Sequence, residues 1–400
     1  MGGMGMTRSG AAAYDFDGSR PSSPFYNETH HALRQSMRRF VDLEIMPHIE
    51  VWEAEGRLPL SLHQKAAEHG FLQMGFPEAY GGVRDGIDVF HSIVRTEELA
   101  RCGAGGVSAS LMTHGIGLPP VLALGSDAMK QAIAPDVLAG RKIIALGITE
   151  TSGGSDVAAL TTKAERQGDY YLVNGGKMFI TSGMRADYLT CAVRTGGAGI
   201  GGISLLLIDM ASKGVTRQPL HKMGWHASDT AQIFFDDVKV PAQNLIGAEN
   251  QGFAGIMLNF NGERLGMAAG ANAFARVCLE DAAVWARERR TFGKRLADHQ
   301  VIRHKLAEML RHINATQSYL ELTAWRVAQG ETPVADLSML KVQATTTMEF
   351  CAREAMQILG GNGYMRGSRI ERIYREVRVN AIGGGSEEIM RDLTARQMGL

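Results

Sequence analysis

The sequence predicts an α+β protein in which a helical region, an antiparallel β region and a second helical region follow one another. Three observations carry this prediction: apolar residues at helical spacing before residue 140, strand-like runs between residues 143 and 245 with no helix between them, and Ala- and Met-rich helical segments after residue 252. We expect a flexible leader and three domains, with the bounds 1–24, 25–142, 143–248 and 249–400.

Composition narrows the class of protein. Of 400 residues, 42 are basic and 42 acidic, so the formal net charge is zero, and 45% are hydrophobic. This composition is typical of a globular protein, and zero net charge argues against nucleic acid as the main partner. The 4 cysteines lie far apart, which favours a reducing compartment, and we expect no metal ligands. We find no run of about 18 apolar residues and no signal peptide, so we expect no membrane span.

The first region is expected to be helical. Apolar residues of the segment 29–47, such as Leu33, Met37 and Phe40, stand near helical spacing. The segments 60–70, 89–101 and 128–138 show the same pattern. Gly/Pro breaks such as Leu118–Pro120 are expected to separate the helices.

The middle region is expected to form an antiparallel sheet or a small barrel. Tyr170–Val173 and Lys177–Ile180 flank Asn174-Gly175, which is typical of a hairpin with an Asn-Gly turn. Further strands are predicted at 188–194, 203–209 and 231–240.

The segment Gly197–Gly202 satisfies the pattern G-x-G-x-x-G. A dinucleotide-binding fold needs a helix directly after these glycines, and the residues 203–208 are typical of a strand instead. We therefore interpret the segment as a flexible hairpin loop.

The last region is expected to be a bundle of about four helices, because the links between its helical segments are short. The segments are 252–290, 296–329, 335–359 and 386–397. The motif Arg289–Lys294 by itself is explained by a helix C-terminus with Arg in its last turn and Gly at its end.

Two loops are rich in small or hydroxylated residues. Leu146–Asp156 offers hydroxyls and backbone N–H groups that suit a phosphate or a polar ring system, although a plain Ser/Gly loop has the same composition. Asn380–Ile389 has three glycines before a helix start, with Ser386 as a candidate N-cap. The alternative for this segment is a flexible loop between two helices.

Glu263 is the sharpest candidate for a catalytic residue. It shares a stripe at helical spacing with Phe260, Met267 and Phe274. A carboxylate on an apolar face is costly unless it is paired or functional. Glu263 is therefore either half of a salt bridge, for example with Arg264, or a general base whose pKa burial raises toward neutrality.

Together, several motifs in this order resemble the acyl-CoA dehydrogenase family. The motifs are Thr149–Asp156, Asn174–Lys177 with Phe179–Thr181, Arg289–Gly293 with Gln300, Gln357–Gly361, and the Gly-rich loop before Ser386. The resemblance covers the chain from about Phe25 to Leu400. The order of regions is similar to that family's N-terminal α domain, middle β domain and C-terminal four-helix bundle.

This resemblance implies FAD as the cofactor. The residues expected around the flavin are Leu146, Ile148, Thr149, Ser155, Phe179, Thr181, Ser386 and Glu388, with Glu388 in place of the more usual Gln. The residues expected at the pyrophosphate and adenosine, partly across a subunit interface, are Arg289, Phe292, Gln300, Gln357, Gly360 and Gly361. The residues expected to bind the acyl-CoA are Ser155, Arg264 and Gly384.

The resemblance also implies the reaction, which oxidises an acyl-CoA thioester to a trans-2-enoyl-CoA and passes a hydride to FAD. Many members place the catalytic Glu in the closing loop, where Gly384 stands here. A second group, which includes the isovaleryl-CoA and long-chain enzymes, places it on the first bundle helix before an Arg. Glu263-Arg264 matches that placement, so Glu263 is the predicted base and Glu387 the alternative. The Gly384 N–H is expected to donate to the thioester oxygen.

Family membership further implies an electron-transferring flavoprotein as electron acceptor and a homotetramer built as a pair of dimers. The expected compartment is the bacterial cytoplasm, or the mitochondrial matrix in a eukaryote. The chain is similar to bacterial members that include citronellyl-CoA dehydrogenase, but the length and branching of the acyl group stay open. The alternative functions are a flavin-dependent oxidase or monooxygenase on the same fold, and an FAD- or CoA-binding protein without turnover.

Overall fold

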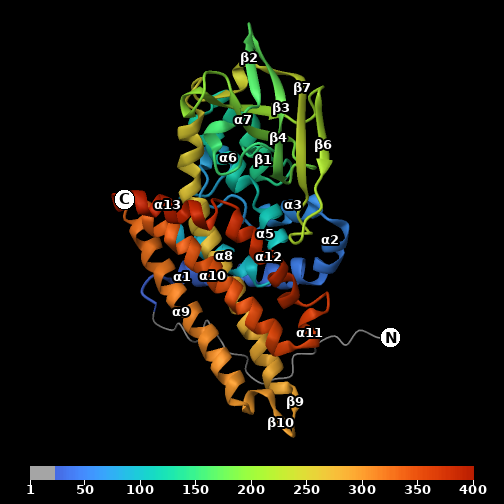
Figure 1. Cartoon of the computed structure of the whole chain (residues 1–400). Coiled ribbons are helices and arrows are strands. Elements are labelled where there is room, and N and C mark those ends of the chain that lie inside the picture. Colours follow the sequence, from blue (N-terminus) through green and yellow to red (C-terminus); the bar gives the residue numbers. More distant parts are fainter. Residues whose placement is uncertain (1–22) are drawn as a thin grey trace.

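The computed structural model describes residues 23–400, except for the side chains at positions 258, 259 and 261. A β-sheet stands at one end of the molecule, and long C-terminal helices extend to the opposite end (Figure 1). Most of the predicted leader, residues 1–24, lies outside the described residues. The predicted α+β class and the order of helices, sheet and helices are confirmed.

The N-terminal part is helical, as predicted. Its helices are α1 Glu28–Phe40, α2 Ile49–Glu55, α3 Leu60–Glu68, α4 Val89–Ala100, α5 Gly105–Leu111, α6 His114–Leu124 and α7 Asp127–Leu138. The predicted break at Leu118–Pro120 is wrong, because both prolines lie inside α6. Leu118 and Val121 are buried in a cluster with Ile144 of β1 and Ile256 of α8, and this packing outweighs the backbone hydrogen bonds that two prolines remove.

The stretch Gly105–Leu124 has the length and composition of a membrane-crossing helix, and 50% of its apolar window is buried inside the molecule. It consists of α5 and α6, which have 7 and 11 residues. Because a crossing helix needs about 20 residues, neither of these two helices is long enough alone. The apolar character of the stretch is explained by its packing in the core.

Helices α1 and α4 begin next to each other with matching capping boxes. Asn27 caps α1 and its N–H donates to His30 Nδ1 over 3.0 Å, while Asp88 caps α4 and its N–H donates to His91 Nδ1 over 3.2 Å. His30 Nε2 lies 2.9 Å from Asp88 Oδ1. The ligand atoms of His30, Asp88 and His91 lie within 4.8 Å of one another, and the helix caps account for this proximity.

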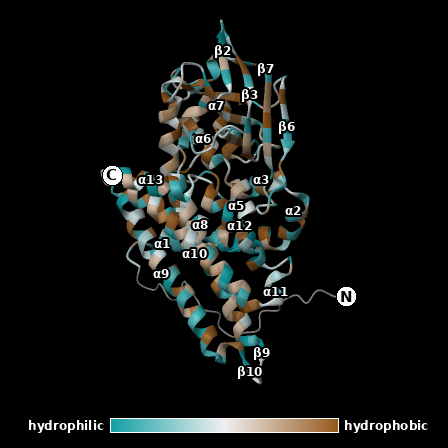
Figure 2. Cartoon of the chain, viewed as in Figure 1, coloured by the Kyte–Doolittle hydropathy of each residue, from teal (hydrophilic) through white to brown (hydrophobic). Residues whose placement is uncertain are grey.

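The middle part is an 8-stranded sheet with the order β6-β7-β3-β2-β4-β5-β8, in which β1 pairs with β4. The strands are β1 Ile144–Gly147, β2 Lys163–Gln167, β3 Tyr170–Thr181, β4 Tyr188–Arg194, β5 Ile203–Asp209, β6 Val215–Pro219, β7 Thr230–Pro241 and β8 Leu245–Ile246. Within this sheet, the β1–β4 and β2–β4 pairs are parallel and the other strand pairs are antiparallel. The predicted strands at 188–194, 203–209 and 231–240 are confirmed, and the loop after Arg194 joins β4 to β5 as a hairpin, as predicted. β2 is largely hydrophilic, whereas β7 carries apolar residues (Figure 2).

The predicted Asn-Gly hairpin is wrong, because β3 runs without reversal through Asn174-Gly175. A register shift marks a β-bulge there, and the side chain of Asn174 exchanges two hydrogen bonds of 2.9 Å with Asp237 of β7. Gly175 has a φ of 136°, and a Cβ at this position would lie 2.8 Å from the backbone of Thr162. The glycine is thus required by a bulge and a close approach.

The C-terminal part contains α8 Gly252–Glu288, α9 Gln300–Ala328, α10 Val334–Leu359, α11 Gly361–Tyr364, α12 Arg369–Ile382 and α13 Glu387–Gln397. The four predicted helical segments are confirmed, whereas α12 was not predicted. Its signals were Ser368, which caps the helix, and the buried Ile370, Ile373 and Val377 at helical spacing. The explanation of Arg289–Lys294 as a helix end is incomplete, because α8 ends at Glu288 and a small hairpin follows, β9 Arg290–Thr291 and β10 Lys294–Arg295.

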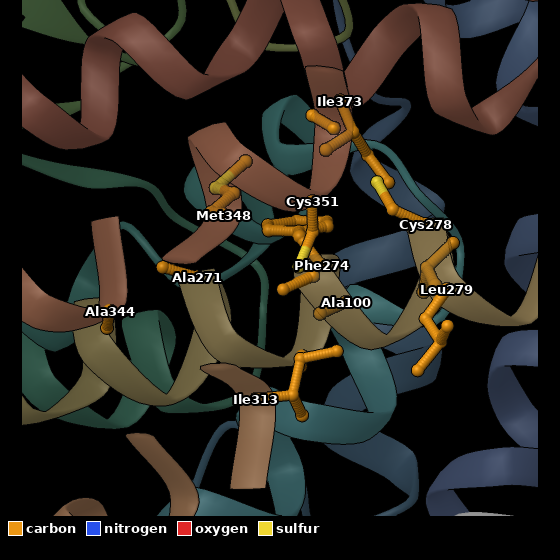
Figure 3. Packing of buried hydrophobic residues seen from close by; sticks show 14 of the residues in the cluster. Ala100, Ala271, Phe274, Cys278, Leu279, Ile313, Ala344, Met348, Cys351 and Ile373 are labelled. Atoms are coloured by element: carbon orange, nitrogen blue, oxygen red, sulfur yellow. The ribbon is translucent and has the colours of Figure 1, made fainter. Parts of the chain in front are cut away.

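The bundle core lies where α8 and α10 pack along their lengths. Figure 3 shows Phe274 and Cys278 of α8 among Cys351 of α10, Ile313 of α9 and Ile373 of α12. All four cysteines are buried and free. The core fixes α8 against its neighbours, and α8 carries Glu263.

Candidate active site

Glu263 is half-buried on α8. Burial raises the pKa of its carboxyl to about 7, and the neighbouring Arg264 opposes this only in part. Arg264 is buried, and its guanidinium lies 6.0 Å from the centre of the Phe260 ring. The carboxyl therefore stands where it can take up a proton near neutral pH.

The loop Gly383–Gly385 joins α12 to α13 and lies against α8 one turn beyond Glu263. Gly384 and Gly385 have φ values of 67° and 101°, which favour glycine. A Cβ at position 384 would lie 2.5 Å from Met267 Sδ. The backbone at position 384 thus favours glycine, and Met267 would have to shift to admit a side chain there. Ser386 caps α13 as predicted, since its Oγ accepts from the Ile389 N–H over 3.4 Å.

A bulge in β3 turns Phe179 out of the sheet. The register of β3 against β7 shifts between Lys177 and Ile180, and Phe179 adopts a φ of 62° with 66% of its surface exposed. The N–H of the preceding Met178 donates to the Thr149 carbonyl over 2.8 Å. A non-glycine residue in this conformation is strained, and such residues cluster at binding sites. The bulge also brings the two predicted flavin segments, around Thr149 and Phe179, side by side.

A buried ion pair holds the Thr149 loop to β3. Lys177 Nζ lies 2.7 Å from Glu150 Oε1 and donates to the Ile148 carbonyl over 3.1 Å, and the side chains are 0% and 4% exposed. Glu150 also accepts from the N–H groups of Thr161 and Thr162, over 2.6 and 2.9 Å. Burial alone would raise the pKa of Glu150, but Lys177 and these donors outweigh it and lower the pKa to about 2.

Sequence reasoning missed this pair. The available signal was the alternation of side chains along a strand. Lys177 is an even number of residues from Tyr171 and Val173 in β3, and all three side chains are buried. A lysine at such a position needs a buried partner. Glu150, in the loop that contacts β3, is that partner.

The residues predicted for the pyrophosphate and adenosine lie elsewhere. They are all exposed, and they are Arg289, Phe292, Gln300, Gln357, Gly360 and Gly361. Phe292 is 97% exposed at the tip of the β9–β10 hairpin, where it and Gly293 have φ values of 49° and 78°, as in a type I′ turn. The hairpin and α11 lie at the opposite end of the molecule from the sheet (Figure 1). One chain therefore does not bring the two groups of predicted FAD residues together.

The flavin-side residues fit a flat, polar ring system. The exposed aromatic side chain of Phe179 stands two residues from Thr181, and both Thr149 and Thr181 are partly accessible. Ser155 is exposed in the same loop as Thr149, whereas Leu146 and Ile148 lie at the end of β1 and just beyond it. Glu388, in the first turn of α13, is exposed, and hydrogen bonds from its own N–H and from Ser386 lower its pKa.

Comparison with protein-family models gives three consecutive matches. They are the acyl-CoA dehydrogenase N-terminal domain over residues 27–141, the middle domain over 145–238 and the C-terminal domain over 250–399. The three matches follow the order of the helical, sheet and helical parts of the structure. The chain belongs to the acyl-CoA dehydrogenase family.

Individual relatives agree with this assignment. The chain is 40% identical to the acyl-CoA dehydrogenase AFT10-1 of Alternaria alternata, covering 95% of this chain and 93% of that protein. It is 34% identical to the mitochondrial long-chain specific acyl-CoA dehydrogenase of Mus musculus, covering 93% and 87%. A crystal structure described as a probable acyl-CoA dehydrogenase from Mycobacterium abscessus matches with a TM-score of 0.92 and 49% identity over 94% of this chain and 100% of that one.

Two further solved structures bear on cofactor and acceptor. A glutaryl-CoA dehydrogenase of Mycobacterium smegmatis, 25% identical with a TM-score of 0.88 over 94% of this chain and 95% of that one, is in complex with FADH2. A chain 30% identical with a TM-score of 0.89, over 94% and 99%, comes from a study of the electron-transferring flavoprotein of Acidaminococcus fermentans. The protein is an FAD-dependent oxidoreductase that acts on acyl-CoA, as its family is.

Proposed function

We propose that Glu263 is the catalytic base with which this chain oxidises an acyl-CoA thioester between its α and β carbons. The observation that carries the proposal is the half-buried carboxyl with a pKa of about 7, beside a loop whose position 384 has a left-handed backbone that favours glycine. A carboxyl with this pKa is a competent base near neutral pH.

In this reaction, Glu263 and Gly384 have different roles. Glu263 takes the α-proton of the thioester, the β carbon loses a hydride, and the remaining electron pair forms the C=C bond of the trans-2-enoyl-CoA. FAD, when bound, accepts the hydride. Negative charge develops on the thioester oxygen, and the Gly384 N–H is the proposed donor to it, which would lower the barrier because the hydrogen bond strengthens as the charge grows.

The other predicted residues complete the proposed site. Leu146, Ile148, Thr149, Phe179 and Thr181 form the flavin side, with Ser386 and Glu388 at the closing loop. Ser155 and Arg264 face the acyl-CoA.

The cofactor is proposed to bridge two subunits. Arg289, Phe292, Gln300, Gln357, Gly360 and Gly361 would serve the FAD of a partner copy, because within one chain they lie far from the flavin side (Figure 1). Phe292 is 97% exposed at the tip of the hairpin, so its side chain is accessible to a partner copy. A homotetramer built as a pair of such dimers is the proposed assembly.

The remaining proposals concern the cell. Relatives include a mitochondrial enzyme and one from Bacillus subtilis, and we place this chain in a bacterial cytoplasm or, in a eukaryote, in the mitochondrial matrix. An electron-transferring flavoprotein is the proposed electron acceptor. The acyl group is proposed to be branched or long, in line with the position of the base on α8 and the 34% identity to a long-chain enzyme.

The test mixes the yellow holoprotein anaerobically with butyryl-, isovaleryl-, octanoyl-, citronellyl- and palmitoyl-CoA, each in turn. The absorbance of the flavin is recorded after each mixing. Bleaching by one or two members supports the dehydrogenase and names the substrate class. Bleaching followed by rapid return of colour in air would favour the oxidase instead. If no thioester bleaches the flavin, the proposed reaction is wrong.

A further inference from the structure

Lys341 is a fully buried lysine on α10 that faces the Gly383–Gly385 loop. Its side chain is 0% exposed, and its Nζ donates to the Gly385 carbonyl over 2.7 Å. The same Nζ lies 3.4 Å from the carbonyl of Ala381 in the last turn of α12. An ammonium group is costly to bury, so its place at this loop calls for an explanation.

The charged groups around Lys341 come from two other helices. Glu387 and Glu388 of α13 favour its charged form, whereas Arg264 of α8 disfavours it. Glu387 also forms a salt bridge with Arg391, with 2.9 Å between Oε2 and Nη2. The described hydrogen bonds of the Lys341 ammonium go to two backbone carbonyls, which are those of the loop and of the helix before it.

We propose that Lys341 is a positioning residue for the oxidation, which holds the loop so that the Gly384 N–H points at the thioester oxygen. Three consecutive glycines have more conformational freedom than any other tripeptide, and two of them adopt positive φ here. Lys341 anchors the loop from the α10 side, and Met267 contacts Gly384 from α8. The inference rests on the proposed function of the Gly384 N–H.

The charge of Lys341 has a second effect. An ammonium buried close to the loop adds positive potential where negative charge develops on the thioester oxygen, and charges act more strongly in such an enclosed site than in water. Burial, with Arg264, lowers the pKa of Lys341 to about 8, although Glu387 and Glu388 oppose the shift. Above this pH the ammonium loses its proton and the added potential disappears.

The experiment measures the acidity of the α-proton directly. The probe is an acyl-CoA analogue with sulfur in place of the β carbon, which can lose its α-proton but has no β-hydride to give. Its ionisation on the holoprotein is followed by the long-wavelength absorbance of the complex as pH is varied. The variants are Lys341→Met, which keeps the length of the side chain without its donor, and Lys239→Met, a matched control at an exposed lysine of β7.

Lys341→Met is expected to raise the pKa of the bound α-proton by about one unit or more and to slow flavin reduction by about tenfold or more, as expected when a donor to the oxygen is misplaced. The affinity for the enoyl-CoA product should change little, and Lys239→Met should match the parent protein in every measurement. An unchanged α-proton pKa in a Lys341→Met protein that binds FAD would overturn the inference.

Lys341→Arg keeps the test decisive if Lys341→Met fails to fold. Arginine stays charged, so the loss of α-proton acidity and reduction rate above about pH 8 should disappear in this variant. Persistence of that alkaline loss would overturn the inference. Failure of the parent protein to be reduced by any thioester would instead refute the proposed function, so the two failures are distinguishable.

Discussion

The rate of flavin reduction should follow the ionisation of Glu263. A base works only when it is deprotonated, and a pKa of about 7 moves the loss of activity up from the ordinary value of 4.5. The ionised fraction is then about one half at pH 7 and about one tenth at pH 6. At saturating acyl-CoA, the rate constant should rise about tenfold per pH unit below the midpoint. It should reach its maximum between about pH 7 and pH 8 and fall again above about pH 8, where Lys341 loses its proton. An acyl chain that displaces water from the carboxyl would move this midpoint further up.

The matched perturbation is Glu263→Gln, which keeps the shape of the side chain and removes the base. We expect the variant to retain yellow FAD and to bind acyl-CoA, while flavin reduction slows by about 10²–10⁴-fold. The rise of the reduction rate with pH below the midpoint, which we call the acidic limb, should also disappear. The assay is anaerobic stopped-flow with the thioester that reduces the parent protein fastest. Glu387→Gln, at the alternative carboxylate, should keep the acidic limb.

Two results would refute this reasoning. One is a reduction rate that stays flat between about pH 5.5 and pH 8 in the parent protein. The other is an acidic limb with the same midpoint in Glu263→Gln. Loss of this acidic pH dependence in Glu387→Gln alone would assign the base to Glu387 at the start of α13.

Three further predictions concern the supports of the site. Lys177→Met leaves the Glu150 carboxylate buried without its partner and should lower the free energy of unfolding by about 3–5 kcal/mol; a cost below about 1 kcal/mol in a denaturant titration would contradict the role of this pair. Arg289→Ala should leave Tm almost unchanged but release FAD on dialysis, and equal flavin content after dialysis would speak against the bridging model. Adding Gly384→Glu to Glu263→Gln should not restore flavin reduction, because the left-handed backbone at position 384 strains any residue other than glycine and Met267 must shift to admit the new side chain; recovery to within about tenfold of the parent rate would show that the loop can carry the base.

The helix and strand pattern could be predicted where one periodicity runs over many residues. Helices α8, α9 and α10 are long, so their apolar stripes outweigh local noise. Short-range signals failed where tertiary contacts override them. Asn174-Gly175 is a turn signal that serves as a bulge against Asp237, and Pro119-Pro120 is a break signal inside a packed helix.

In the candidate site too, some residues could be recognised from local sequence patterns and others only from tertiary contacts. Glu263 could be selected from the sequence because a single carboxylate interrupts an apolar stripe of its own helix. Lys341 could not, because its importance comes from a loop more than forty positions away that only the folded bundle brings to it. Met267 is likewise an ordinary core residue in the sequence, and its contact with Gly384 exists only in three dimensions.

The distance between the flavin side and the β9–β10 hairpin has a thermodynamic consequence for the bridging model. If each FAD contacts two copies of the chain, cofactor binding and subunit association are linked equilibria, and each must strengthen the other. Dilution should then release FAD from a protein whose individual chains are still folded. Flavin content then becomes a measure of subunit assembly. A change in the β9–β10 hairpin of one copy that weakens its contact with FAD would lower the activity of the neighbouring copy.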